Sequence, residues 1–130
     1  MDLVTSRMCL TKNLGVNGNL FGGDMLAFID EAAAIYCTQY CKTEAMVTLK
    51  MKEVIFKKPV KEGDAIRIYA EMMHVGTTSA SVKIEVRVQS AFTSEEEVVC
   101  TTEVIFVRVD KRGRPRPIDE SVKLKFNLDK

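Results

Sequence analysis

Asp30 is the residue whose chemical type conflicts most with its surroundings. It lies in residues 24–41, DMLAFIDEAAAIYCTQYC, which read as one helix because they favour helix and contain no Gly or Pro. Its neighbours one helical turn away are Leu26, Ala27, Ala33 and Ala34. Burying an unpaired carboxylate is costly, so we expect Asp30 to be paired, hydrogen-bonded or retained for a function.

The Gly22-Gly23 step comes directly before this predicted helix and is the second candidate for chemistry. A helix N-terminus presents free backbone N–H groups and a positive dipole end, and glycine lets a ligand approach that backbone closely. A carbonyl placed there would be polarised, and an oxyanion formed from it would be stabilised. Asp30 lies about 10 Å further along the axis, at ~1.5 Å per residue. A bent ligand bound between subunits could therefore meet Asp30 and Gly23 from different copies.

Other reaction chemistries lack their residues in this sequence. The single histidine, His74, lies in a predicted strand beside a turn, and no GxSxG motif accompanies it. The four cysteines show no zinc-type spacing, so we predict buried, reduced thiols and no metal site. A carboxylate for acid–base work, together with helix-end amides, is the chemistry that is left.

Composition indicates a globular protein with one domain over residues 1–130. Of its 130 residues 46% are hydrophobic and 28% charged, and the net charge of +1 shows no basic excess for binding nucleic acid. The N-terminus has no evident signal peptide, and apolar runs such as 25–29 are far shorter than the ~20 residues that span a bilayer. We therefore expect a cytoplasmic protein that does not enter membranes.

Periodicity predicts one long helix followed by four long antiparallel strands. The strands are 46–56, 65–75, 79–90 and 98–109, and 79–90 alternates apolar and polar residues most cleanly. Residues 1–12 are a weak first strand, 13–23 a structured Asn- and Gly-rich loop, and 110–130 a charged loop and tail. The helix is apolar nearly all round, so we expect it to be buried with the sheet wrapped about it. This α+β arrangement is the hotdog fold.

Several short motifs, in order over residues 8–117, resemble those of the hotdog acyl-CoA thioesterases. The type is the bacterial YciA-like and animal cytosolic acyl-CoA thioesterase group. The residues that carry the resemblance are Asn17-Gly18-Asn19-Leu20-Phe21-Gly22-Gly23, Ile29-Asp30-Glu31-Ala32, Val47-Thr48, Phe56-Lys57-Lys58-Pro59-Val60 with Gly63-Asp64, Val75-Gly76-Thr77-Thr78-Ser79 and Gly113-Arg114-Pro115-Arg116-Pro117.

The resemblance implies hydrolysis of acyl-CoA thioesters to a free acid and coenzyme A. It implies that Asp30 is the catalytic carboxylate, a general base or a nucleophile, with the amide of Gly23 in the oxyanion hole. Thr48 is a candidate for orienting Asp30 or its water. The family often carries an Asn two positions before Asn17; this chain has Gly15 there, and Asn17 or Asn19 is the candidate replacement.

Coenzyme A contacts and self-association also follow from the resemblance. The substrate-binding candidates are Phe21, Gly22, Lys57, Lys58, Thr77, Thr78, Ser79 and Arg114. No cofactor is expected, because coenzyme A enters with the substrate, and dimers are expected to join into tetramers or hexamers. Two alternatives stay open: a non-catalytic acyl-CoA-binding protein, and a dehydratase of the same fold. Dehydratases of this fold usually carry a His near the central helix, whereas His74 is in another segment.

Overall fold

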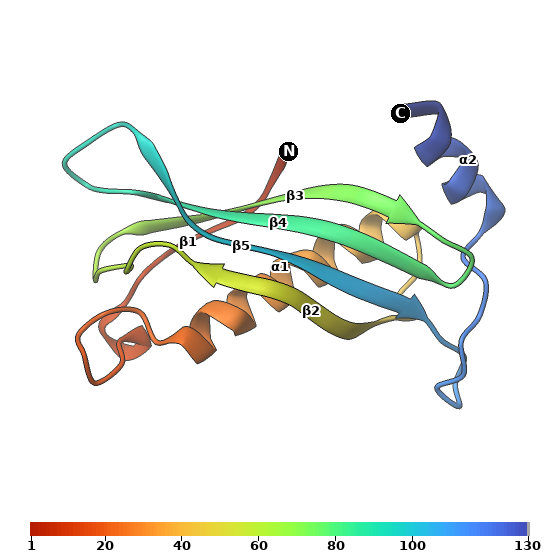
Figure 1. Ribbon diagram of the computed structural model, residues 1–130, viewed down its shortest axis with the longest axis horizontal. Helices are drawn as coiled ribbons and strands as arrows, with labels where there is room; N and C mark the ends of the chain where they lie inside the picture. The colour runs from red at the N-terminus through yellow and green to blue at the C-terminus, as the bar shows by residue number, and fades with distance from the viewer. Residues whose placement is uncertain (130) are drawn as a thin grey trace.

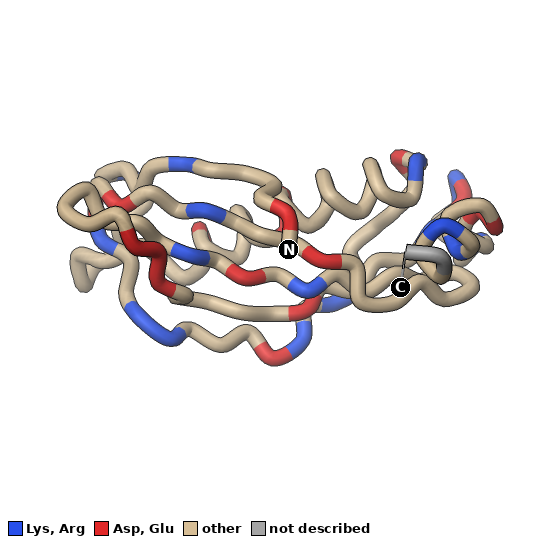
Figure 2. Tube along the Cα trace, turned by 90° about the horizontal axis from the view of Figure 1, so that it is seen from above, with Lys and Arg blue, Asp and Glu red and all other residues tan. Residues whose placement is uncertain are grey.

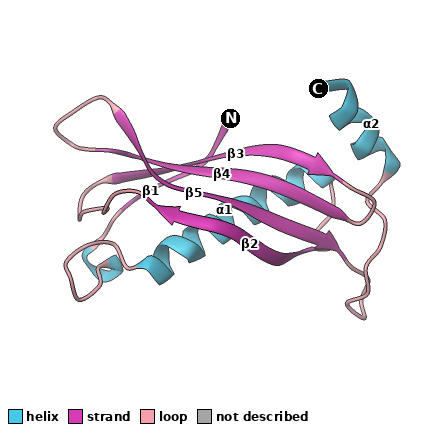
Figure 3. Ribbon diagram, in the orientation of Figure 1, coloured by secondary structure: helices cyan, strands magenta, loops and turns pink. Residues whose placement is uncertain are grey.

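A computed structural model describes residues 1–129 and shows a five-stranded antiparallel sheet with one long helix along one face (Figure 1). The elements in chain order are β1 (Asp2–Met8), the 3-10 helix η1 (Thr11–Asn13), α1 (Gly22–Cys41), β2 (Met46–Phe56), β3 (Ala65–Val75), β4 (Ser79–Gln89), β5 (Glu96–Arg108) and α2 (Glu120–Asp129) (Figure 3). Across the sheet the order is β1-β3-β4-β5-β2. The predicted hotdog fold is confirmed.

The core lies between α1 and the inner face of the sheet. Strand β4 shows the reason: its apolar residues alternate with polar ones, and Val82, Ile84 and Val86 are completely buried. Their register partners on β3 and β5 are buried with them, including Ile68 and Val104. Alternation therefore fixes which face of each strand receives the helix.

Charged residues of both signs are interspersed along the strands (Figure 2). One row of register partners crosses four strands as Glu71, Lys83, Glu103 and Lys52, so that neighbouring charges alternate in sign. The Lys52 ammonium lies 3.6 Å from the Glu103 carboxylate. Opposite charges on facing strands support the pairing of those strands by up to about 1 kcal/mol per pair.

Helix α1 is buried on the side that faces the sheet, as predicted, and its other side is open in a single copy of the chain. Its buried residues are Met25, Ile29, Ala32, Ala33, Cys37 and Cys41. On the other side Ala27 and Ile35 are exposed, and Ala34 is half-buried. One sheet can cover only the stripe of helix that faces it. Among the described residues, no helix is both long and apolar enough to cross a membrane.

Strand β2 forms one edge of the sheet, and apolar side chains are exposed along it. Val47, Leu49, Ile55 and Phe56 are each about half exposed or more, at 48%, 61%, 49% and 53%. The register with β5 shifts twice along β2, once between Thr48 and Lys50. An apolar edge strand with unpaired backbone is a surface that proteins usually cover.

The predicted C-terminal tail is in part a helix, α2, packed against the end of α1. Its apolar residues Val122 and Phe126 are buried, as is Ile118 just before the helix, and the three are spaced four apart. The ring of Phe126 meets Tyr40 edge-on, with centroids 6.4 Å apart. The four-residue apolar spacing within a charged stretch is the sequence signal that the prediction of a tail missed.

Candidate active site

Asp30 and Thr48 meet between α1 and β2. The Thr48 hydroxyl donates a hydrogen bond of 2.6 Å to Oδ1 of Asp30, and the Asp30 side chain is only half-buried. The bond orients the carboxylate and occupies one of its two oxygens. The structure thus brings together these two residues, which are 18 apart in the sequence.

The first turn of α1 supplies the candidate amides. The first backbone bond of the helix runs from the N–H of Met25 to the carbonyl of Phe21 at 3.1 Å, so the N–H groups of Gly22, Gly23 and Asp24 precede it. The Asp24 carboxylate accepts a bond from Nδ2 of Asn13 at 3.1 Å, which ties the loop to the helix. Negative charge is favoured at this end of a helix.

Asp30 and the amides of its own helix are too far apart to act on one carbonyl group. Asp30 lies seven positions after Gly23, which corresponds to about 10 Å along the helix axis. A general base and the donors of an oxyanion hole must both lie within about 3 Å of the reacting atoms. One copy of the chain therefore holds the two halves of a site without assembling them.

The loop before α1 is a structured turn, as expected, and it accounts for Asn17. Oδ1 of Asn17 accepts a bond from the Asn19 N–H at 3.1 Å, and Gly18 adopts a positive φ of 83° between them. Asn17 lines grooves beside the helix start whose walls do not include Asp30. The structure therefore gives Asn17 a turn-forming contact and does not bring it to the carboxylate.

Lys57 and Lys58 lie beside the same helix start. With Asn17, Leu20, Met25 and other residues they line a groove of about 260 Å³. The Lys58 ammonium is 2.5 Å from a Glu97 carboxylate oxygen, an ion pair that the sequence did not reveal. Lys57 is exposed and has no ion-pair partner among the described residues. Of the two predicted cations, Lys57 is the more available to an anion.

The Thr77-Thr78-Ser79 turn lies at the other end of the helix. The carbonyls of Thr77 and Thr78 accept the N–H groups of Ile118 and Arg108, at 2.7 and 2.9 Å. The backbone of Ser79 closes the turn by accepting the Gly76 N–H at 2.7 Å. These carbonyls are thus used within the chain. Since α1 has 20 residues, about 30 Å separates this turn from Lys57.

Arg114 lies in a loop organised by Asp110. Asp110 accepts the backbone N–H groups of Arg112 and Arg114, at 2.8 and 3.0 Å, and pairs with the guanidinium groups of Arg114 and Arg116 at 3.2 and 3.1 Å. The backbone N–H of Arg114 is the main reason that the pKa of Asp110 is lowered. The loop is therefore fixed, and its two paired arginines share one carboxylate.

The cysteines do not compete with Asp30 as nucleophiles. All four are buried and free of disulfide bonds. Burial raises the pKa of Cys100 to about 11 and also raises that of Cys9, so both are thiols at neutral pH. Cys41, whose pKa is lowered by its hydrogen bond with Cys37, is only 2% exposed.

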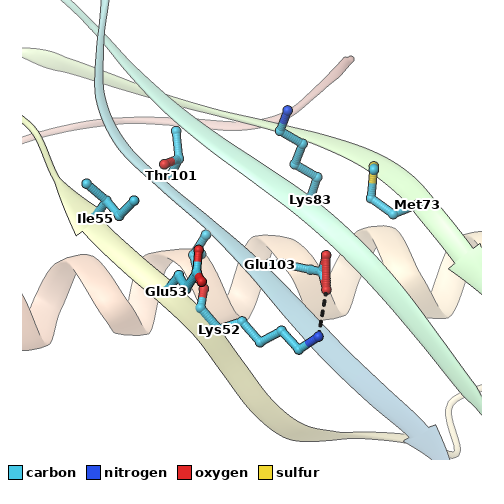
Figure 4. A pocket seen from close by; sticks show the side chains of 8 residues that line it. Lys52, Glu53, Ile55, Met73, Lys83, Thr101 and Glu103 are labelled. Carbon is cyan, nitrogen blue, oxygen red and sulfur yellow. Dashed lines mark hydrogen bonds and ion pairs between the residues drawn. The ribbon is translucent and has the colours of Figure 1, made fainter.

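A further hollow of about 430 Å³ lies on the face of the sheet away from α1 (Figure 4). It is lined by Lys52, Glu53, Ile55, Met73, Lys83, Thr101, Thr102 and Glu103. Glu103 is already paired with Lys52 across the strands. The hollow is separated by the sheet from Asp30 and from the helix start, so it adds nothing to that chemistry.

Comparison with known proteins agrees with this arrangement. The thioesterase superfamily matches residues 17–92, more than half of the chain. The acyl-CoA thioester hydrolase YciA of Escherichia coli is 32% identical over 120 residues, which cover 90% of each chain. This chain belongs to the hotdog-fold acyl-CoA thioesterases.

Two further proteins of this family are similar to this chain. The uncharacterised acyl-CoA thioester hydrolase YkhA of Bacillus subtilis is 33% identical over 106 residues, covering 82% of this chain but only 61% of the relative's length. The hexameric hotdog fold thioesterase of Campylobacter jejuni superposes with a TM-score of 0.89 at 32% identity, covering 98% of this chain and 97% of that one. The match to the Campylobacter jejuni structure thus spans nearly the whole length of both chains.

Phe56 and Glu97 contact candidate site residues, and the sequence assigned neither of them a role. Phe56 belongs to the motif Phe56-Lys57-Lys58-Pro59, where only the lysines had an evident chemistry. In the structure a Cβ placed on Gly22 would lie 3.9 Å from Cζ of its ring. Glu97 is distant in sequence from Lys58, and the pairing of β2 with β5 brings the two together.

Proposed function

We propose that this protein hydrolyses acyl-CoA thioesters to a free acid and coenzyme A, with Asp30 as the general base. The observation that carries the proposal is the hydrogen bond from Thr48 to Asp30, which orients a carboxylate that is only half-buried. Similarity to known proteins supports the substrate class, because relatives named acyl-CoA thioester hydrolases align over 90% of this chain.

In the proposed reaction Oδ2 of Asp30 takes a proton from water as the water oxygen attacks the thioester carbonyl carbon. The carbonyl oxygen becomes an oxyanion and accepts hydrogen bonds from the free N–H groups of Gly22 and Gly23. When the tetrahedral intermediate collapses, the C–S bond breaks. The proton held by Asp30 then passes to the departing thiolate, which leaves as coenzyme A.

The amides that face Asp30 are proposed to come from a second copy of the chain, because the 10 Å separation within one copy is too long. The exposed apolar edge of β2 and the uncovered side of α1 support self-association. The hexameric state of the Campylobacter jejuni relative is consistent with this. We therefore propose a homo-oligomer built from dimers, as a tetramer or a hexamer.

The same separation suggests how coenzyme A is held. Lys57 stands at the start of α1, whereas Thr77, Thr78, Ser79 and Arg114 lie at its end. If both groups bind one ligand, they belong to different copies. We propose that the phosphates of coenzyme A are met by Lys57 of one copy and by the loop around Arg114 of another.

The test is hydrolysis of a panel from acetyl-CoA to palmitoyl-CoA, measured by release of free thiol. The Asp30→Asn variant should lower kcat by about 10²–10⁴-fold, since it removes the base and keeps the shape. Glu31→Gln is the matched control, because its carboxylate is next in sequence and exposed. Unchanged turnover in Asp30→Asn would refute the assignment. Tight acyl-CoA binding without turnover by the unaltered protein, or hydration of an enoyl-CoA instead, would favour the two alternatives.

A single-turnover reaction in ¹⁸O-water separates the base from a nucleophile. With Asp30 as base, the label enters only the released acid. A nucleophilic Asp30 would displace the coenzyme A thiolate and form an anhydride with the acyl group, and attack of water on the Asp30 carbon of that anhydride would put label into the carboxylate of Asp30. Label found by mass spectrometry in the peptide that contains Asp30 would therefore establish the nucleophile and refute the base.

A further inference from the structure

Two half-exposed phenylalanine rings lie directly against the glycines at the start of α1. A Cβ placed on Gly23 would be only 2.6 Å from Cε2 of Phe21, and one placed on Gly22 would be 3.9 Å from Cζ of Phe56. Yet Phe21 is 56% exposed and Phe56 is 53% exposed. Each ring packs one part of its surface on a glycine and leaves the rest open.

The rings stand on different sides of the helix start. The Cβ directions of consecutive helical residues are about 100° apart around the axis. Phe56 accordingly lines the groove of about 260 Å³ with Lys57 and Lys58. Phe21 lines a neighbouring groove of about 550 Å³, which shares Asn17 and Leu20 with the first and also includes Gly22. The two rings come from distant parts of the chain and border adjoining grooves beside the first turn of α1.

Gly15 also lies against the Phe21 ring. A Cβ on Gly15 would lie 3.6 Å from Cδ1 of Phe21, so the ring is set between the loop and the helix. The loop itself is tied down, because the N–H of Phe21 donates to the Asn13 carbonyl and that of Leu20 to the Val60 carbonyl, both at 2.8 Å. The exposed part of the ring is thus held in place by its backbone and by Gly15 and Gly23, without being buried.

We infer that Phe21 and Phe56 form the two walls of a slot that receives the thioester group itself. This inference rests on the proposed function. Amides stabilise an oxyanion far better where water is excluded, because the local dielectric falls. Rings beside the amides would exclude water once a substrate lies between them. The lysines on the Phe56 side match the anionic coenzyme A portion, so that portion is placed in the Phe56 groove.

The slot makes a prediction that a wall of the acyl-chain pocket does not make. Every acyl-CoA carries the same thioester group, whatever the length of its acyl chain. Removing a wall should therefore lower kcat by the same factor for short and long chains. A ring that contacts only the acyl chain would instead matter more for long chains and would change KM.

The experiment compares Phe21→Ala and Phe56→Ala with Phe92→Ala, which removes a third exposed ring, 96% exposed at the tip of the β4–β5 loop. We expect kcat to fall about tenfold in the first two variants, equally for acetyl-, octanoyl- and palmitoyl-CoA, and KM to change by less than about twofold. Phe92→Ala should match the unaltered protein. Leucine at position 21 or 56 should restore part of the loss, because it rebuilds an apolar wall.

Three outcomes would overturn the slot. They are an unchanged kcat in both alanine variants, a loss that grows with chain length, and a loss in Phe92→Ala of the same size. Phe21 lies outside the β2 edge, so its variant decides the matter if light scattering shows that Phe56→Ala alters the assembly. The outcome is distinct from failure of the proposed function, in which the unaltered protein would release no thiol from any acyl-CoA.

Discussion

The two ends of α1 differ in how much of their surroundings is already occupied. At the start, three N–H groups precede the first helical bond, and two aromatic rings beside them are half exposed. At the end, α2 packs with Phe126 against Tyr40, and the neighbouring turn has its Thr77 and Thr78 carbonyls bonded within the chain. The start of α1 therefore has N–H groups and rings open to a ligand, whereas the end of α1 is covered by other parts of the chain.

The candidate substrate contacts are accordingly of two kinds. Those at the start, around Gly23 and Lys57, have unsatisfied or exposed groups. Those at the end, around Thr78 and Arg114, already stabilise the fold through backbone bonds and an ion pair. We therefore expect changes at the start to affect turnover, and changes at the end to affect stability first.

The largest expected effect tests whether the start of one copy serves Asp30 of another. Asp30→Asn and Gly23→Leu should each be nearly inactive, the first without a base and the second with a side chain where the Phe21 ring lies. Assemblies that contain both variants should regain about a quarter of normal activity, because random pairing about a two-fold axis gives some sites with neither change.

Activity of the mixed assemblies is measured after co-expression with two different affinity tags. Each variant expressed alone with both tags is the control. No recovery in the mixture would show that the amides and Asp30 act within one copy, and the shared site would be wrong.

Phe126→Ala tests the closed end. The ring is 6% exposed, and removing a buried Phe typically destabilises a protein by about 3 kcal/mol through lost burial and the cavity left behind. Urea unfolding measures the loss, while kcat of the folded enzyme should stay within about twofold. A fall in kcat larger than the fall in stability explains would place α2 in the active site.

Gly23→Ala and Gly22→Ala form a matched pair at the open end. The new methyl at position 23 would lie 2.6 Å from the Phe21 ring and force it to move, whereas at position 22 it would lie 3.9 Å from Phe56, an ordinary contact. We expect kcat/KM to fall about 30-fold for Gly23→Ala, on the scale of losing one oxyanion donor, and several-fold less for Gly22→Ala. The reverse order would contradict the position given to the Phe21 ring.

Thr48→Val should have a smaller effect, because it removes one hydrogen bond to Asp30 and keeps the side-chain shape. A lost bond to a charged group of this kind corresponds to about a tenfold fall in kcat. Thr48→Ser keeps the hydroxyl and is the control. Equal kcat in the Val and Ser variants would mean that Thr48 does not orient the base.

The smallest effect concerns the last turn of α1, where Lys42 has a φ of 54° in the left-handed region. Glycine adopts this conformation without strain, so Lys42→Gly should stabilise the fold by about 0.5 kcal/mol with no change in kcat. Thermal melting checks the stability. A lower melting temperature would show that the Lys42 side chain contributes more than its backbone strain costs.

Much of this arrangement was predictable from local patterns. Strict alternation at residues 79–90 gave β4, and an uninterrupted run of helix-forming residues gave α1, which starts two residues earlier than predicted. The conflict between Asp30 and its apolar neighbours identified the candidate base, which the structure joins to Thr48. The helix at the C-terminus was missed because charged residues mask the four-residue spacing of Ile118, Val122 and Phe126.

The sequence was sufficient to name the candidate groups, since a carboxylate within an apolar helix and two glycines before it are visible without any coordinates. Which of these groups meet depends on the tertiary structure. It brought Thr48 to Asp30 and Phe56 to Gly22, it gave Lys58 a partner in Glu97, and it placed the Thr77-Thr78-Ser79 turn a helix length away from Lys57. The physical reason is that local sequence sets the direction of each side chain along its own element, whereas strand order and register set the distance between elements.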